Sequence, residues 1–426
     1  MSDCRHARHA RPSSLRRQTT LLALLLAGLC PLAGAETSPW YLGASQAFAY
    51  DSNLYRIDEN VQLTGAYSRS DTISTTSLVG GIDQPIGRQR VFGNATVGYN
   101  RYSNNDYLNN TSYSMTAGLD WSTVERFSGN VNLSASQNQR RFNLDTTPGQ
   151  AETRKNNETV EQVDAVFRTG VVTRLTLEAG LGYRQVGYSA DEYANSEYDQ
   201  TSGSLGVRYR PGIATFGASY RHAQSNYKET STLQVNDNTR DSLDLTVSWP
   251  ASAVSNVYLR LSPTQVRYDD FTDRDFTGVT GALSWDWRPT GKLKVGTRLV
   301  YDLGQDSAFE RFGTSASPTG INTTARTTTD FRLNADYEAT AKINLTAALG
   351  ASHRSLDQGT DPFCLSTGTC TGSDNTTTFS LGARWTPLRS TQVGCSLGRD
   401  QRSAKGGLTQ DYNANTVSCY GQFTLQ

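Results

Sequence analysis

The sequence predicts an all-β fold, a transmembrane antiparallel up-and-down β-barrel of about 18 strands with short periplasmic turns and long extracellular loops. Three observations lead to this prediction. Apolar and polar residues alternate with a period of two along many segments, which is a strand period. Only 36% of the 426 residues are hydrophobic, although the chain contains 21 Tyr and 37 Gly. Short turns alternate with longer segments rich in Asn, Asp, Ser, Thr and Gly, as in outer-membrane barrels.

The alternation is clear in the segment GALSWDWRPTGKLKVGTRLVYDLGQ, residues 281–305. Leu283 and Trp285 occupy one phase, and Ser284 and Asp286 occupy the other. Pro289-Thr290-Gly291-Lys292 then forms a tight turn before a second alternating run, so the segment predicts a β-hairpin. Because a single closed layer of such strands needs little aliphatic core, the low hydrophobic content favours a barrel over a soluble sandwich.

Aromatic residues recur at the strand ends that precede short turns. They are spaced roughly 40–50 residues apart or a small multiple of that distance, the length of one hairpin and one long loop. Trp and Tyr at such positions are typical of the interfacial girdle, where a ring lies between headgroups and acyl chains. The predicted girdle residues are Trp121, Tyr209, Trp249, Trp287, Tyr337 and Trp385.

The two phases of each strand predict two different surroundings. Strands cross lipid only as a closed barrel, since every backbone polar group needs a partner there. The apolar phase should therefore contact lipid, and the polar phase should line a wet lumen that tolerates charge. The candidate lumen residues include Arg forks suited to carboxylate or sulfate groups and Tyr rings suited to sugar faces. They are Arg184, Arg208, Arg210, Arg221, Arg260, Arg288, Lys294, Arg298, Arg332, Arg354, Arg384, Tyr188, Tyr258 and Tyr420. The alternative is that these charges pair across strands and only stiffen the wall.

The N-terminus predicts export to the Gram-negative cell envelope. Arg16 and Arg17 precede the apolar run Leu21–Leu29, and Ala33-Gly34-Ala35 follows as a small-residue cleavage site. Residues 1–35 are therefore predicted to be a secretory signal peptide and residues 36–426 an integral outer-membrane barrel. Lipid attachment at Cys30 is disfavoured because Leu29, not a small residue, precedes it.

Four cysteines remain after the predicted cleavage, and they permit three pairings. Cys364 and Cys370 share one polar loop, while Cys395 and Cys419 lie about equally far from the Gly406-Gly407 turn. We therefore expect disulfides Cys364–Cys370 and Cys395–Cys419, as is common in an oxidising compartment. No His accompanies these cysteines and their spacings are not those of zinc sites, so neither a metal nor another cofactor is predicted.

Other function classes are disfavoured. The formal net charge is +0, which gives no electrostatic reason to expect nucleic acid as a partner. His353 and Ser355 lie in the same phase, two residues apart, and Asn375 begins the next strand. An outer-leaflet lipase or deacylase would use such a His-x-Ser pair. The pattern has only three residues and arises often by chance, so the chain is predicted not to be an enzyme.

Several short motifs in order resemble the EpsL-type outer-membrane β-barrels encoded in bacterial exopolysaccharide operons. The motifs are DSNLYR at 51–56, IDQPIGRQRV at 82–91, LDWS at 119–122, DFTGVTGALSWDWRPTGKLKV at 275–295 and YDLG at 301–304. The resemblance spans nearly all of the predicted mature chain. It implies a conduit that secretes an extracellular polysaccharide, works with periplasmic polysaccharide-export proteins and inner-membrane synthesis components, and contacts outer-membrane lipid.

A general or sugar-selective diffusion porin is the alternative, since it shares each structural feature described above. Exporter and porin differ in the plugging of the lumen and in their partners. Neither property is visible in a single chain.

Overall fold

A computed structural model describes residues 38–425 except 64, 66, 143–150, 171–172, 229–236, 270–274, 304–324, 358–370 and 407. Pro39–Gln426 form one compact unit, which is the barrel described below. The predicted signal peptide, residues 1–35, lies outside the described residues, as do Cys364 and Cys370.

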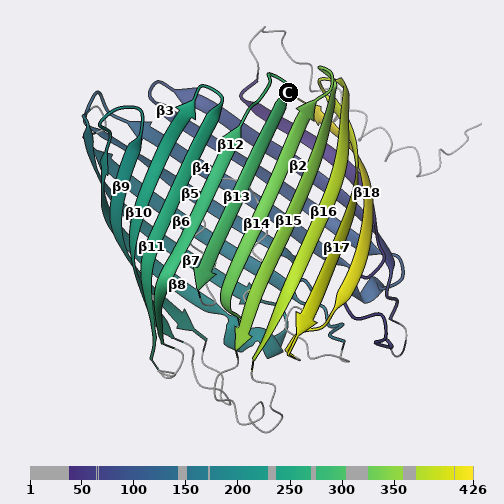
Figure 1. The fold of residues 1–426 in the computed structure, drawn as a ribbon. Helices are drawn as coiled ribbons and strands as arrows, with labels where there is room; N and C mark the ends of the chain where they lie inside the picture. Colours follow the sequence, from purple (N-terminus) through teal and green to yellow (C-terminus); the bar gives the residue numbers. More distant parts are fainter. Residues whose placement is uncertain are drawn as a thin grey trace, which may run out of the picture. The chain divides into compact units, whose positions relative to one another are not determined.

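Eighteen strands form a single antiparallel sheet (Figure 1). Their bounds are β1 Trp40–Asp51, β2 Asp71–Ile86, β3 Gln89–Tyr102, β4 Asn110–Ser122, β5 Phe127–Gln139, β6 Asn157–Thr169, β7 Leu175–Tyr188, β8 Tyr198–Tyr209, β9 Thr215–Tyr227, β10 Asn238–Ser252, β11 Ser255–Tyr268, β12 Phe276–Trp287, β13 Leu293–Leu303, β14 Ala325–Glu338, β15 Ile343–Asp357, β16 Thr371–Leu388, β17 Thr391–Lys405 and β18 Tyr412–Leu425. Two 3-10 helices, η1 Asp106–Leu108 and η2 Asp191–Ser196, lie between strands. Among the described residues, no helix is long and apolar enough to cross a membrane.

The sheet closes into a barrel because its first and last strands pair. β1 pairs with β2 on one side and with β18 on the other, with Leu42 opposite Leu425 and Asp51 opposite Thr416. Every other strand pairs with its two neighbours in the chain. Closure removes the unpaired strand edges that lipid cannot satisfy. The predicted fold is therefore confirmed, including the count of 18 strands.

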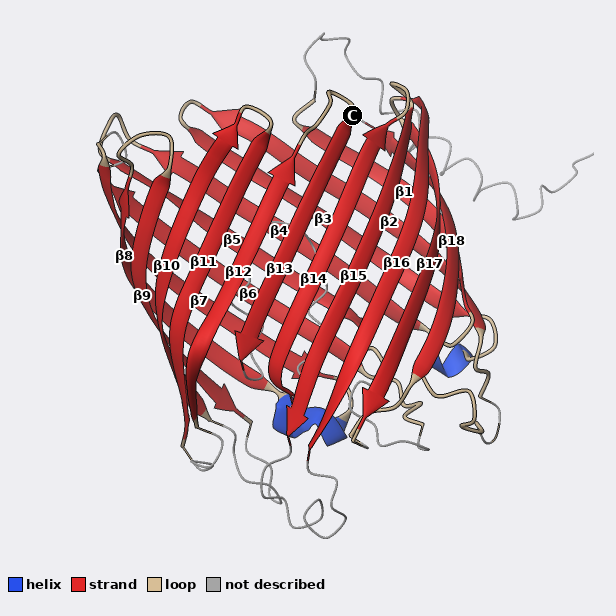
Figure 2. Cartoon of the chain, viewed as in Figure 1, coloured by secondary structure: helices blue, strands red, loops and turns tan. Residues whose placement is uncertain are grey.

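The two ends of the barrel differ, as predicted. Short turns follow the even-numbered strands, such as the two-residue turn Gly87-Arg88, where Gly87 has φ +62°. Glycine adopts this left-handed conformation without steric cost. The longer loops follow the odd-numbered strands, and both 3-10 helices lie at that end (Figure 2). Short turns mark the periplasmic end and long loops the extracellular end.

Strand β10 shows how the two faces differ. Leu243 and Leu245 are each 45% exposed, whereas Asp244 between them is 5% exposed. The same alternation of exposed apolar side chains continues on the other strands, for example at Leu181, Leu205, Leu261, Phe379 and Leu397. Such a belt of outward apolar side chains is the surface that a bilayer covers. The protein is an integral outer-membrane barrel that contacts membrane lipid.

Buried apolar residues gather near the extracellular end of the barrel. One cluster joins loop residues to the ends of strands and comprises Tyr55, Ile57, Val61, Tyr102, Leu108 and Phe142. A second cluster contains Val186, Tyr198 and Tyr227. The best-packed apolar groups of the described residues therefore hold loops at the mouth.

Candidate functional site: the inner wall and the mouth

The inner wall carries most of the residues predicted to line a lumen. Alternation places their side chains on the face opposite the lipid-facing residues of each strand. Arg210 and Arg288 are the exceptions, because they lie one residue beyond the ends of β8 and β12, in the periplasmic turns. The Arg210 Nε donates to Thr215 Oγ1 at 3.2 Å across its turn. The alternation of faces ends with the strand, so the expectation that Arg210 and Arg288 line the wall does not hold.

Two carboxylates on β7 and β10 gather several of the predicted arginines. Glu178 accepts from Arg168 Nε at 2.6 Å and from Arg208 Nε at 2.8 Å. Asp244 on β10 contacts Arg221 on β9 and, on β11, Arg260 at 3.5 Å. It also accepts a hydrogen bond from the Ser262 hydroxyl at 2.5 Å. Each carboxylate thus bridges two guanidinium groups. This wall is stiffened by ion pairs and still carries more positive than negative charge.

Three further predicted residues lie close to this cluster. Tyr258 precedes Arg260 by two residues on the same face of β11. Arg184 donates to Gln162 Oε1 at 3.4 Å, and the Tyr188 hydroxyl donates to Glu158 Oε1 at 3.3 Å. The structure therefore brings arginine and tyrosine side chains together along β6–β11.

The wall formed by β13–β16 is organised differently. Arg298 lies directly opposite Arg332 on the neighbouring strand. Among the described residues, Arg332 and Arg384 form no salt bridge with a carboxylate. Lys294, near the periplasmic end, pairs with Glu338 at 3.0 Å. This side of the lumen therefore presents two guanidinium groups, those of Arg332 and Arg384, that form no salt bridge with a described acid.

Other predicted lumen residues have structural partners. Near the extracellular end, Arg354 Nε donates to both Asp374 oxygens at 3.0 Å, and both side chains are buried. At the opposite end, Gln392 Nε2 donates to the Tyr420 hydroxyl at 2.6 Å. A buried bidentate pair such as Arg354–Asp374 fixes the wall.

The predicted girdle residues all lie on the outer face. They stand near the periplasmic ends of β4, β8, β10, β12, β14 and β16, at Trp121, Tyr209, Trp249, Trp287, Tyr337 and Trp385. Trp285 stacks on Trp287 with ring centroids 5.5 Å apart. All six positions therefore lie at the same end of the barrel, the end with the short turns.

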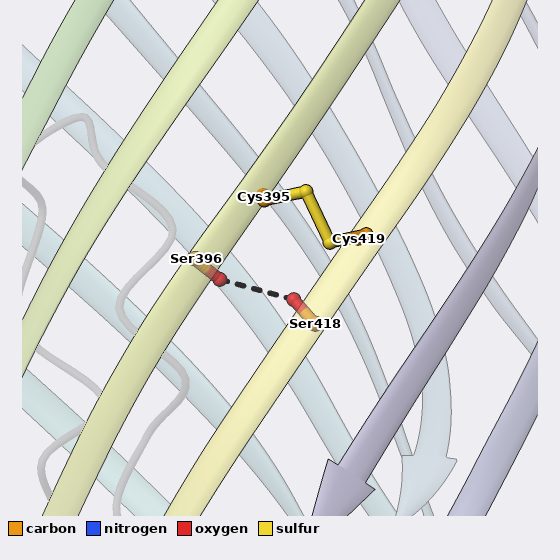
Figure 3. Close-up of a disulfide and its surroundings, with 4 residues drawn as sticks. All are labelled: Cys395, Ser396, Ser418 and Cys419. Carbon is orange, nitrogen blue, oxygen red and sulfur yellow. Dashed lines mark hydrogen bonds between the residues drawn. A yellow bond between two sulfur atoms is a disulfide. The ribbon is translucent and has the colours of Figure 1, made fainter.

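Cys395 and Cys419 form a disulfide between β17 and β18 (Figure 3). Their side chains share the outer phase with Leu397 and Val417, which are exposed. The adjacent pair, Ser396 and Ser418, points the other way and is joined by a hydroxyl–hydroxyl hydrogen bond of 3.0 Å. The disulfide therefore lies outside the lumen.

His353 lies on the outer face near the extracellular end of β15. Its Nδ1 is 2.8 Å from Asn375 Oδ1 on β16. Ser355 lies opposite Ser373 in the register, and no His353–Ser355 hydrogen bond exists among the described residues. The base and its orienting amide are therefore in contact, while the nucleophile is not. Within the described ranges, no cluster of three or more His, Cys, Asp or Glu side chains is arranged to hold a metal ion.

The mouth contains a group of side-chain contacts that sequence reasoning did not predict. Arg56, in the loop between β1 and β2, donates from Nη1 and Nη2 to the two Asp51 carboxylate oxygens at 2.9 and 2.8 Å. Burial by itself lowers the pKa of the Arg56 guanidinium, but bonding to Asp51 and the charge of Asp400 outweigh this and raise the pKa. Arg69 donates to the carbonyl oxygens of Ile57 and Val61 at 3.2 and 2.6 Å. These contacts hold the loop in one conformation.

Tyr55 links three loops at the mouth. Its hydroxyl lies 2.7 Å from Asn105 Oδ1 and 2.7 Å from the Tyr107 hydroxyl. Its ring packs edge-on against Phe142, with centroids 4.9 Å apart. The aromatic residues within otherwise polar loops were the signal in the sequence that could have identified this cluster, because such rings are rarely left in water in groups.

Comparisons with known proteins find solved outer-membrane structures that have little sequence identity to this chain. No known protein family matches the chain, and no curated protein matches it. A solved structure of the outer membrane protein OpdK from Pseudomonas aeruginosa is 14% identical, with 91% of this chain and 99% of that chain covered and a TM-score of 0.47. OccAB4 from Acinetobacter baumannii is 11% identical, with 92% and 99% covered and a TM-score of 0.48. OccK5 (OpdH) from Pseudomonas aeruginosa is 10% identical, with 92% and 100% covered and a TM-score of 0.45.

These comparisons correct two expectations. The EpsL-type resemblance is wrong, because the similar solved structures are Occ and Opd porins. The expected secretion of an extracellular polysaccharide and the expected periplasmic export partners are also wrong, since only that resemblance implied them. The physical reason lies in the motifs themselves. LDWS at 119–122 ends β4 at the girdle and DSNLYR at 51–56 ends β1 at the mouth, so both occupy positions where many barrels need such residues.

Proposed function

We propose that this protein is a passive diffusion porin for small hydrophilic solutes, with a preference for anions. The observation that carries the proposal is a closed ring of 18 strands whose inner face is polar and charged. A barrel of this size leaves an aqueous channel unless loops fill it. Transport through such a channel needs no catalytic step, so an enzymatic role is not part of the proposal.

The anion preference follows from the wall of β13–β16. Arg332 and Arg384 have no carboxylate partner among the described residues, and Arg298 lies beside Arg332. Guanidinium groups that face a channel without a salt bridge to an acid raise the local concentration of anions and lower that of cations. The same wall also carries inner-face acids, Asp302, Asp330, Asp336, Glu338 and Asp374. The preference therefore depends on the position of the two arginines and not on an excess of positive charge.

The test is electrical. The purified barrel is inserted into planar lipid bilayers, and single-channel current is recorded in symmetric KCl and then across a KCl gradient. We expect stepwise conductance and a reversal potential on the chloride side, whose size falls in Arg332→Gln/Arg384→Gln. Absence of conductance from correctly folded protein would refute the porin proposal. Conductance with a potassium-side reversal potential would refute the anion preference alone.

Sugar selectivity is tested in the same preparation. The tyrosines near arginine on β6–β11, such as Tyr188 and Tyr258, offer rings that suit sugar faces. Swelling rates of protein-containing vesicles in isotonic solutions of neutral sugars and size-matched polyols distinguish the two cases. Equal rates indicate general diffusion, and faster entry of sugars indicates selectivity.

A further inference from the structure

Asp400 receives side chains from three different segments at the extracellular mouth. It lies on the inner face of β17, and its side chain is 15% exposed. Arg56 Nε, from the loop between β1 and β2, lies 3.5 Å from Asp400 Oδ2. Arg141, just after β5, also binds Oδ2, and the Tyr412 hydroxyl donates to Oδ1 at 3.0 Å.

The contact from Arg141 reaches over the lumen. Five strands, β18, β1, β2, β3 and β4, separate β17 from β5 in the wall. Side chains from strands this far apart meet only if one of the segments leaves the wall and crosses part of the opening. A second bond in the same place, from Arg141 Nη2 to the Tyr412 hydroxyl at 3.0 Å, supports the crossing.

The two loops that converge on Asp400 are also joined to each other. Tyr55 of the first loop packs against Phe142 of the second. Beyond that point, Lys155 Nζ donates to Asn109 O at 2.5 Å and Tyr107 donates to Thr153 O at 2.7 Å. The described parts of the loop between β5 and β6, residues 140–142 and 151–156, are thus held from both sides of the mouth.

We infer that Asp400 is a size-determining residue of the pore, because it holds the segment around Arg141 across the mouth. This inference rests on the proposed porin function. It identifies the contact that limits which solutes enter from the extracellular side. Arg56 also binds Asp51, whereas the ion-pair partner of Arg141 among the described residues is Asp400. Loss of this carboxylate therefore removes the charged contact of Arg141.

Loss of the carboxylate should release this segment. In Asp400→Asn the side chain keeps its shape but no longer neutralises the two guanidinium groups, which then repel each other in a partly buried site. Arg141→Gln removes the crossing side chain itself. Both variants should widen the mouth in the same way, so the double variant should behave like either single one.

Glu192→Gln is the matched control. It replaces a carboxylate by an amide and breaks another ion pair of the same loop, Arg154–Glu192, in which both side chains are exposed. This pair does not involve β17. Heat-modifiable migration on gels verifies that each variant is a folded barrel before its conductance is compared.

The experiment measures single-channel conductance and the cut-off for neutral polyethylene glycols of graded size added to the extracellular side. We expect Asp400→Asn and Arg141→Gln to raise the conductance and shift the cut-off to larger polymers, while Glu192→Gln matches the wild type. Wild-type conductance with an unchanged cut-off in Asp400→Asn would overturn the inference and leave the porin proposal intact.

A second readout does not depend on conduction. Trypsin added outside the membrane should cleave after Lys155 faster in Asp400→Asn than in the wild type. If the wild type does not conduct but this cleavage accelerates, the porin proposal fails and the role of Asp400 at the mouth stands. Equal cleavage rates in Asp400→Asn and the wild type would count against that role.

Discussion

Arg298 on β13 and Arg332 on β14 occupy directly opposite positions on the inner wall, in register across two antiparallel strands. Like charges at such positions are destabilising, so this arrangement is kept at a cost to the fold. Under the proposed function, this pair places two guanidinium groups on the wall of the channel.

Replacing one of these two arginines should therefore stabilise the fold and weaken the anion selectivity. We expect Arg332→Gln to raise the free energy of unfolding by about 0.5 kcal/mol, within the range of cross-strand pairs, and to reduce anion selectivity. Denaturant unfolding in detergent and the reversal potential in a KCl gradient measure the two effects. In Arg168→Gln the same charge is lost, but so is its bond to Glu178, and this control should be less stable than the wild type. Lower stability in Arg332→Gln would argue against repulsion at this pair.

Arginine substitutions on the outer and inner faces of one strand should differ in their effect on the free energy of unfolding. Leu245 faces outward near the middle of β10, and Thr246 faces inward. We expect Leu245→Arg to lower the free energy of unfolding by about 2–4 kcal/mol, the cost of arginine on the lipid face near the midplane. Thr246→Arg should change stability much less, because its side chain reaches water in the lumen. Unfolding of the two variants from lipid vesicles by guanidinium measures the difference, and equal losses would contradict the assignment of the faces.

The mouth should respond to alkaline pH. Burial, and next the hydrogen bond with Tyr107, raise the pKa of the Tyr55 phenol above its ordinary value. A raised pKa means that the neutral phenol stabilises the loops fully below about pH 10, the pKa of unfolded tyrosine, and that this contribution is lost as pH rises through the folded value. Ultraviolet titration near 295 nm should show that Tyr55→Phe removes one late-ionising tyrosine.

The same variant tests the hydrogen bonds themselves. Loss of the Tyr55 hydroxyl should weaken the loop cluster by about 1 kcal/mol, seen as faster hydrogen exchange in the loop between β1 and β2. If Tyr55→Phe removed a tyrosine that ionises early and left hydrogen exchange in this loop unchanged, the buried hydrogen bonds of the Tyr55 hydroxyl would be contradicted.

The disulfide predicts stability without an effect on conduction. Cys395 and Cys419 are 24 residues apart in sequence, and a cross-link of this span contributes about 3 kcal/mol by restricting the unfolded chain. Cys395→Ser should therefore lower the denaturation midpoint but leave single-channel conductance unchanged, since the sulfur atoms face outward. Ser396→Ala, on the inner face of the same strand, should leave the midpoint nearly unchanged. A change of conductance in Cys395→Ser would contradict the assignment of the disulfide to the outer face.

The sequence allowed the wall of the barrel to be predicted and left its mouth unpredicted. Alternation such as Leu243-Asp244-Leu245 is a local property, so strands and faces follow from it directly. Contacts such as Arg141–Asp400 join a loop residue to a strand residue 259 positions away in the sequence, and no local pattern indicates them. The same reasoning failed at Arg210 and Arg288, where the backbone leaves the strand and the alternation no longer applies.

The family assignment failed for a related reason. Short motifs at strand ends report that a strand ends at a membrane interface, and they do so in barrels of many kinds. LDWS at 119–122 places Trp121 at the girdle whatever passes through the lumen. What distinguishes one channel from another lies in the pairing of inner-wall charges and in the loops, which these motifs do not include.

The pairing of β1 with β18 also constrains the order of assembly. Leu42 meets Leu425, so the seam joins the two most distant strands in the chain and cannot form until the last strand is available. All other strand pairs are neighbours in sequence and can form progressively as hairpins. Until the seam closes, β1 and β18 each expose an edge of unpaired backbone groups. A chain that stops before this step would therefore be prone to aggregation through these edges. Insertion into the membrane should therefore be timed by the final strand.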